Sequence, residues 1–455
     1  MNKLAKLLIM YLSLAYLGQQ ALASNLNSDK IDSPQTLLKK DFDTTATYQK
    51  KLAETDKALL VELVKLAKFN VHYRLESNRH QKWRSLSYPI GREAGTATAF
   101  AGTLVDLRQL SLGLDNLRYI SRNDLKKAVT CGITGNAISG GASALELTQN
   151  AWVMMKANQK GYSPSKTLAF VKEIIANTDR LLETREHLAT EEPSPEKRQI
   201  IELETKLVRR IRQQLLFEFY TWSCHSRDQA WRENTFYALD SLQNFTRMTA
   251  GIFAMKTFNH PALARTSVIY ALVSNSLATL NPIIRNCAGI AIRKHQERKL
   301  AKEIPTERPS ILPDDLDDLE QKLANNTNPD WLRRVTALTY RTEKLDTELN
   351  RETKGIERYR QIAQQQSISG PLIGLTGVAS STLATVAVYR YRKDLDTANK
   401  LGFAGRITHG TGQAYALINT PYTIMRGIMR NHKLRKRGDL PTQILEQRLK
   451  RLESY

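Results

Sequence analysis

The stretch that decides the fold runs from Ala128 to Leu145 and reads AVTCGITGNAISGGASAL. It contains no Asp, Glu, Lys or Arg, and small residues punctuate its apolar positions. Three other stretches share this lack of charge, at residues 266–284, 367–389 and 407–425. The length of each stretch is close to that of a helix that crosses a hydrocarbon core, which needs about 20 residues. The chain therefore contains four segments whose length and composition suit helices surrounded by lipid or by other helices.

Charged segments with a helical repeat lie between the uncharged ones. After Pro195, apolar residues recur at spacings of three and four among Glu, Lys and Arg, at Ile200, Leu203, Leu207, Ile211, Leu215 and Phe219. This spacing places them on one stripe of a helix. No sustained alternation typical of strands is found. The sequence therefore predicts an all-α fold, with long amphipathic helices alternating with Gly/Ala-rich apolar helical hairpins.

Glycines in the uncharged segments indicate close helix packing, because a residue without a side chain lets two backbones approach. We predict this role for Gly135, Gly140, Gly141, Gly370, Gly374 and Gly377. Residues 367–389 are the strongest membrane candidate, but several polar residues in the four segments would be costly against lipid: Asn136, Asn275, Asn281, His409 and Asn419. Insertion into a membrane and burial at the centre of a soluble bundle therefore both remain open.

The N-terminus has the features of a secretory signal. Lys3 and Lys6 precede an apolar run, and Ala21 and Ala23 form a small-residue cleavage site before Ser24. Cleavage there predicts an exported protein of the periplasm or cell envelope. An uncleaved signal anchor is the alternative.

The uncharged and charged segments suggest a division of the chain. A Gly/Ala-rich apolar region followed by a charged helical region occurs three times, the apolar regions being 88–155, 245–292 and 368–429. We predict a signal peptide (1–23), a flexible leader (24–45), a first helical module with a Gly-rich segment (46–157), a long amphipathic helix with a second apolar hairpin (158–292), a charged heptad-like region (293–366), a third apolar hairpin (367–429) and a basic C-terminal tail (430–455).

The chain is strongly basic. Its 67 Lys and Arg against 45 Asp and Glu give a net charge of +22, which favours polyanionic partners. A cluster that we predict to bind an anionic surface lies near the C-terminus, at Arg426, Arg430, Lys433, Arg435, Lys436 and Arg437. For an exported protein, anionic lipid or an envelope polymer is a better partner than nucleic acid. A solvated tail is the alternative.

Motifs that would carry chemistry are weak. Cys131, Cys224 and Cys287 are far apart, without metal-ligand spacing, and we expect them to be buried. Cys224 and His225 are adjacent, and neighbouring residues of a helix point in different directions. Residues 405–412 superficially resemble a phosphate-binding loop but lack its Lys-Ser/Thr ending, so they favour a flexible turn. No catalytic residue, metal site or cofactor is predicted.

These patterns support three hypotheses about function. The first is a non-catalytic, exported envelope protein that associates with membranes and assembles with further copies of itself. The second is a soluble exported helical module that binds an anionic polymer or another acidic partner through its basic surface. The third is an enzyme, for which the sequence assigns no class and no constellation of acid, base and nucleophile.

Overall fold

The computed structural model describes residues 45–78, 81–192, 194–304, 321–324, 328–336, 338, 374–438 and 441–453. Of these residues, 94 % are helical and none is in a strand, which confirms the all-α fold. Several sequence predictions fall outside the described residues: the signal peptide, the leader as far as residue 44, Gly370 and most of the heptad-like region 293–366.

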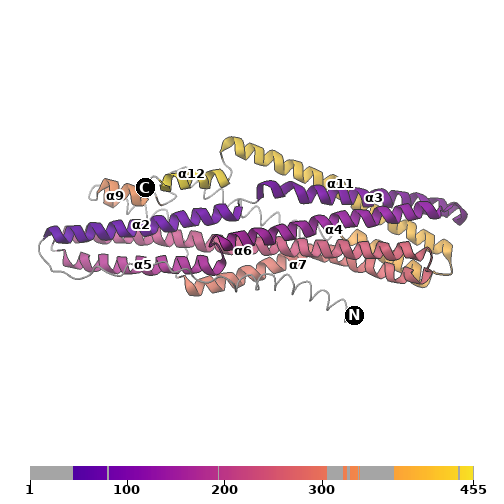
Figure 1. The fold of residues 1–455 in the computed structure, drawn as a ribbon, viewed down its shortest axis with the longest axis horizontal. Coiled ribbons are helices and arrows are strands. Elements are labelled where there is room, and N and C mark those ends of the chain that lie inside the picture. The colour runs from indigo at the N-terminus through magenta and orange to yellow at the C-terminus, as the bar shows by residue number, and fades with distance from the viewer. Residues whose placement is uncertain are drawn as a thin grey trace.

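The molecule is elongated, and one helix runs along most of it (Figure 1). This is α6, Pro195–Thr257, whose 63 residues span about 95 Å at the rise of an α-helix. Pro195 occupies the first turn, where proline is tolerated. The amphipathic segment expected after Pro195 is the beginning of α6, which continues without a break into the second apolar region.

One half of the molecule has an apolar core. It comprises α2 (Thr45–Asn78), α5 (Pro164–Glu191), the first part of α6 and α12 (Pro441–Glu453), with α9 (Pro329–Thr336) beside them. The core is built from closely packed aliphatic and aromatic side chains, including Leu63, Leu66, Val171, Leu207, Ile211, Leu215 and Phe219. We call this part the apolar-core half.

The C-terminus differs from the expected basic tail. Residues up to Arg437 belong to α11 (Leu395–Arg437), and Gly438 then ends that helix in the left-handed conformation. The chain continues into α12, which buries Leu445 and Leu452 in the apolar core. Their spacing of seven residues puts both on one face of the helix. Residues 441–453 are therefore docked against α2.

The other half consists of three antiparallel helix pairs whose turns gather at one end of the molecule (Figure 1). They are α3 (Gln81–Asp115) with α4 (Arg122–Gln159), the second part of α6 with α7 (Ala264–Glu303), and the helix of residues 374–390 with α11. The turns contain η1 (Leu117–Tyr119), η2 (Pro261–Leu263) and residues 391–394. As far as they are described, the three Gly/Ala-rich regions of the sequence lie in these pairs.

The three pairs close into a ring of six helices. Ser143 of α4 donates a hydrogen bond to Asp240 of α6 over 2.5 Å. Asn275 of α7 donates to the carbonyl of Gly377 over 2.9 Å. Thr103 of α3 donates to Gln413 of α11 over 2.8 Å. Each helix thus packs against two neighbours, and we call the assembly the six-helix ring. It comprises α3, α4, α6 from Asp228, α7 as far as Ile290, residues 374–390 and α11.

Glycines bring the helices of the ring together. A Cβ atom on Gly135 would clash with the backbone carbonyl of Gly95, and one on Gly374 would lie 2.7 Å from the Cα atom of Thr279. Gly377 packs on Asn275, and Gly140 lies against Asn244 and Phe245. Gly141 differs from the others, because it is exposed and nothing lies within 4 Å of its Cβ direction.

Residues 405–412 do not form the flexible turn that their glycines suggest. They are part of α11, where a Cβ atom on Gly405 would lie 3.2 Å from the carbonyl oxygen of Ser380 and Gly412 lies against Thr376. Gly405 and Gly412 therefore let α11 and the helix 374–390 approach closely, which outweighs the low helix propensity of glycine.

Candidate functional site: a polar cavity inside the six-helix ring

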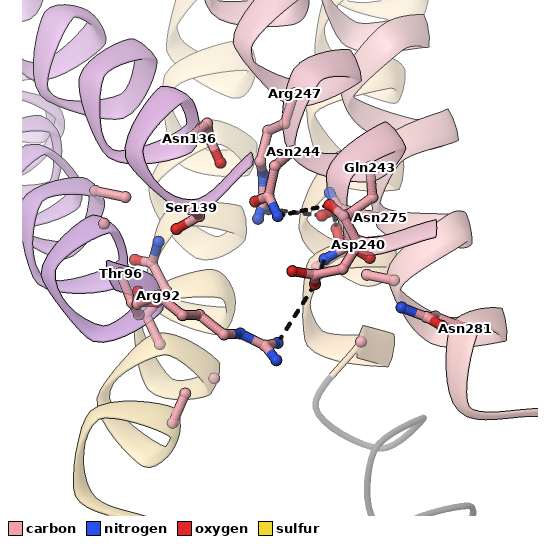
Figure 2. Close-up of a pocket in the computed structure, with 18 of the residues that line it drawn as sticks. Arg92, Thr96, Asn136, Ser139, Asp240, Gln243, Asn244, Arg247, Asn275 and Asn281 are labelled. Atoms are coloured by element: carbon pink, nitrogen blue, oxygen red, sulfur yellow. Dashed lines mark hydrogen bonds and ion pairs between the residues drawn. The ribbon is translucent and has the colours of Figure 1, made fainter. Parts of the chain in front are cut away.

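The six-helix ring surrounds a polar cavity of about 490 Å³ that is partly open to the outside. All six helices contribute to its wall. The charged lining groups are three arginines and one carboxylate, and His409 and seven Asn or Gln side chains complete most of the polar surface. Figure 2 shows how side chains from facing helices converge on this space. The wall therefore carries an excess of positive charge and a high density of hydrogen-bonding groups.

Asp240 of α6 is held by several donors on one side of the cavity. Its carboxylate accepts hydrogen bonds from the hydroxyls of Tyr88 and Ser143, at 2.9 and 2.5 Å, and from the amide of Gln243 at 3.0 Å. Arg92 lies 3.8 Å from this carboxylate (Figure 2). It also donates to the hydroxyl of Tyr88 over 3.0 Å. These groups join α3, α4 and α6, and they use most of the acceptor capacity of Asp240.

Arg247 of α6 has only neutral hydrogen-bond partners. Its Nη2 donates to Oδ1 of Asn275 over 2.6 Å and lies 3.1 Å from Nε2 of His409. Because a guanidinium can only donate, the imidazole accepts at Nε2 and is in the neutral form with hydrogen on Nδ1. Within the described part of the chain, Arg247 therefore has no carboxylate partner.

The orientation of Asn275 is fixed by the neighbouring helix. Its amide nitrogen donates to the carbonyl of Gly377 over 2.9 Å and also to the hydroxyl of Ser381. The carbonyl oxygen of Asn275 is consequently turned towards Arg247. Gly377 makes this arrangement possible, because a side chain there would collide with the amide of Asn275.

The polar residues of the uncharged segments, which would be costly against lipid, lie along the cavity. Asn136, Asn275, Asn281, His409 and Asn419 all line it. The side chains of Asn136, Asn275, Asn281 and His409 are buried or partly buried along this lining, whereas Asn419 is exposed.

The six-helix ring is apolar outside and polar inside. Among the described residues, Val61 is the only exposed large apolar side chain in the apolar-core half. The ring exposes many, including Leu104, Ile138, Leu145, Ile252, Ile269, Leu280, Leu375, Ile407, Ile418 and Met425. Its buried residues are mostly polar, such as Ser139, Ser143, Asp240, Asn244, Asn275, Asn281, Ser380 and Ser381. The two halves thus have opposite distributions of polarity.

Exposed hydroxyls on the ring are satisfied by their own helices. Thr130, Thr148 and Thr382 each donate to the carbonyl four residues earlier, over 2.8 to 2.9 Å. A hydroxyl bonded in this way presents mainly its methyl group to the surroundings. These threonines are consequently compatible with an apolar environment.

The predicted anionic-surface cluster lies outside the cavity. Arg426, Lys433, Arg435, Lys436 and Arg437 are exposed on the last turns of α11, and the side chain of Arg430 lies outside the described residues. This position is at the end of the ring opposite to the three turns. The cavity residues Arg92, Asp240 and Arg247 were not identified from the sequence as functional.

The three cysteines differ in environment, so the expectation that all are buried is wrong. Cys224 is buried, Cys131 is intermediate, and Cys287 is exposed on the outer face of α7. Burial, together with the nearby carboxylate of Glu297, raises the pKa of the Cys224 thiol to about 12. Among the described residues, no group of three or more His, Cys, Asp or Glu gathers as a metal site would require.

We predict that a maleimide reagent at pH 8 modifies Cys287 at least about 100-fold faster than Cys224, because the thiolate is the reactive form and Cys224 is both buried and protonated. Peptide mapping by mass spectrometry measures both rates, and Cys131→Ser removes the third thiol. In denaturant the two rates should become similar. Equal rates in the native protein would contradict the burial of Cys224.

Comparison with known proteins gives no relative: no protein family, no curated protein and no solved structure matches this chain.

Proposed function

We propose that this chain is a non-catalytic envelope protein whose six-helix ring spans a lipid bilayer, with the apolar-core half in water. The supporting observation is the reversed polarity of the two halves. In water, large apolar side chains are buried and polar groups face the solvent, as in the apolar-core half. In lipid the preference is inverted on the outer surface, and polar residues turn to the interior of the bundle.

The dimensions of the ring match a bilayer. The uncharged stretch 266–284 of α7 covers about 28 Å, close to the about 30 Å of a hydrocarbon core. Contacts between neighbouring helices align it with the two uncharged stretches of the third pair: Asn275 contacts Gly377, and Gly412 contacts Thr376. Over residues 234–255 of α6, the charged residues are Asp240 and Arg247, which both line the cavity.

Both ends of the uncharged zone have residues suited to a membrane interface. The three turns, at residues 106–127, 256–265 and 390–400, contain 11 Lys or Arg and 5 Asp or Glu. The opposite end carries the exposed cluster that begins at Arg426. Exposed aromatic residues also occur near both ends, namely Tyr389, Trp152 and Tyr422. Basic and aromatic residues are typical of the headgroup region.

Apolar composition alone identifies only part of the ring. In the described residues, Pro261–Glu303 is the one helix long and apolar enough to cross a membrane by length and composition. A core helix of a soluble protein can meet the same criteria, but it would be mostly buried, whereas 17 % of this apolar window is buried. The other helices have lower mean hydropathy because their inner faces carry the amides and hydroxyls of the cavity.

Membrane fractionation tests the proposal. After export, the protein should remain in the membrane pellet through an alkaline carbonate wash and be released by detergent. Peripheral binding through the basic cluster would instead give release at high pH or high salt, because surface electrostatics are screened by salt. Quantitative release of the protein by the alkaline wash would contradict the proposal and favour the soluble binding module.

A matched pair of substitutions sharpens this test. Ile138 and Val61 are exposed to a similar extent, 39 % and 47 %, on the ring and on the apolar-core half. Lys at a helix centre in lipid costs about 2.5–3.5 kcal/mol, and Lys on a surface in water costs little. Ile138→Lys should therefore increase the fraction that the wash releases, while Val61→Lys should leave it unchanged. Equal behaviour of the two variants would contradict lipid contact at Ile138.

A further inference from the structure

We propose that the cavity of the six-helix ring binds a small molecule through an anionic oxygen group, a carboxylate or a phosphate, on Arg247. The argument rests on the charges and hydrogen bonds inside the ring. It does not depend on whether lipid or water surrounds the outer surface, so it goes beyond the proposed membrane function.

The single carboxylate of the cavity does not neutralise Arg247. Asp240 accepts from Tyr88, Ser143 and Gln243, and its cationic neighbour is Arg92. Arg92 and Arg247 together bring two guanidinium groups to the lining beside this one carboxylate. Positive charge in the cavity consequently exceeds the negative charge that the described lining residues supply.

Arg247 has N–H groups available to donate further hydrogen bonds. Both of its protein contacts use Nη2, so in the described part of the chain the Nε and Nη1 groups have no protein acceptor. A second guanidinium near it, that of Arg406, is already paired with Asp106. Arg247 is partly buried, and a guanidinium withdrawn from bulk water without a counter-ion is costly, so a bound anion reduces that cost.

The chemistry of the wall specifies the class of ligand. A guanidinium is planar and forms paired hydrogen bonds with carboxylate or phosphate oxygens. Two amide oxygens of lining residues, Oε1 of Gln243 and Oδ1 of Asn281, are buried without a hydrogen-bond partner among the described residues. They can accept from hydroxyl or amino groups that accompany the anionic group. A volume of about 490 Å³ suits a small organic molecule.

Isothermal titration calorimetry on the full chain in lipid-free zwitterionic detergent tests the site. The probes are inorganic phosphate and acetate, each added at constant ionic strength maintained with chloride. We expect saturable binding of at least one probe. Arg247→Gln should weaken it at least 10-fold, which corresponds to about 1.4 kcal/mol. Arg108→Gln makes the same chemical change at an exposed position of α3 and should leave the affinity unchanged.

A second variant keeps the test valid if Arg247→Gln does not fold. Gln413→Glu retains the side-chain oxygen that accepts from Thr103, and it adds a carboxylate inside the cavity. That carboxylate repels the anionic probe and supplies Arg247 with an internal counter-charge. We expect weaker probe binding by at least 10-fold, with a helical circular dichroism spectrum like that of the parent chain.

Three outcomes would overturn the site: no saturable binding of either probe, unchanged affinity in both cavity variants, or binding only after vesicles containing anionic lipid are added. The last would assign the anion to lipid headgroups on the outside of the ring. Release of the protein by alkaline wash would instead reject membrane insertion and leave the cavity proposal intact, so the two failures are distinguishable.

Discussion

We expect Arg185→Met to lower the free energy of unfolding by about 3–5 kcal/mol, the cost of removing one partner from a buried ion pair. Arg185 is completely buried in the apolar-core half. Its Nε donates to Asp56 of α2 over 2.7 Å, its Nη2 pairs with Glu204 of α6, and its Nη1 donates to the carbonyl of Ile201 over 2.5 Å. One guanidinium thus joins three helices, and its loss removes the cation that Asp56 and Glu204 share.

Chemical denaturation followed by circular dichroism measures this effect. Arg180→Met is the matched control on the same helix, because Arg180 is exposed, and it should change the free energy of unfolding by less than about 0.5 kcal/mol. Adding Asp56→Leu and Glu204→Leu to Arg185→Met should recover much of the loss, since the uncompensated charges are then gone. A loss for Arg185→Met no larger than that of the control would refute the role of Arg185 as the ionic centre of this half.

The second large effect is expected at Gly135 of the six-helix ring. A Cβ atom there would meet the backbone of Gly95 and Ala99, which cannot move aside as a flexible side chain can. Gly135→Leu should therefore cost about 3 kcal/mol or more, at or above the upper end of ordinary overpacking. The variant should lose the contact between α3 and α4, and with it the shape of the cavity.

Gly141 provides the control for this substitution. It lies six residues further along α4, is exposed, and has nothing within 4 Å of its Cβ direction. Gly141→Leu should be neutral, or stabilising by up to about 1 kcal/mol through higher helix propensity. Thermal melting of both variants in detergent compares them directly. If Gly141→Leu were the more damaging of the two, the observed packing of α3 on α4 would be wrong.

Much of the architecture was accessible from the sequence. The four uncharged stretches lie in helices of the ring, as far as they are described, and the stripe after Pro195 begins α6. These patterns are visible because apolar periodicity reports which face of a helix is buried. The three-fold recurrence of Gly/Ala-rich regions also corresponds to the three helix pairs, although no residue-level alignment supported it.

The cavity could not be predicted from the sequence. Charged residues in α3 and α6, two of the helices that form it, prevent these helices from being recognised as uncharged segments. Arg92 and the adjacent Glu93 interrupt the uncharged character of α3, and Asp240 and Arg247 interrupt that of α6. A search for segments without charge finds α4, α7, residues 374–390 and α11 and misses these two. Whether a charged side chain points into a shared interior depends on which helices are neighbours, and local patterns do not contain that information.

The continuity of α6 has a mechanical consequence. Its first part lies in the apolar-core half, its second part carries Asp240 and Arg247, and no loop or internal proline separates them. A stiff helix without a hinge acts as a lever: tilting or rotating one end displaces the other. If binding of an anion at Arg247 shifts α6, the first part of the helix is therefore displaced as well. That part lies some tens of ångströms away, where Arg185 joins α6 to α2 and α5.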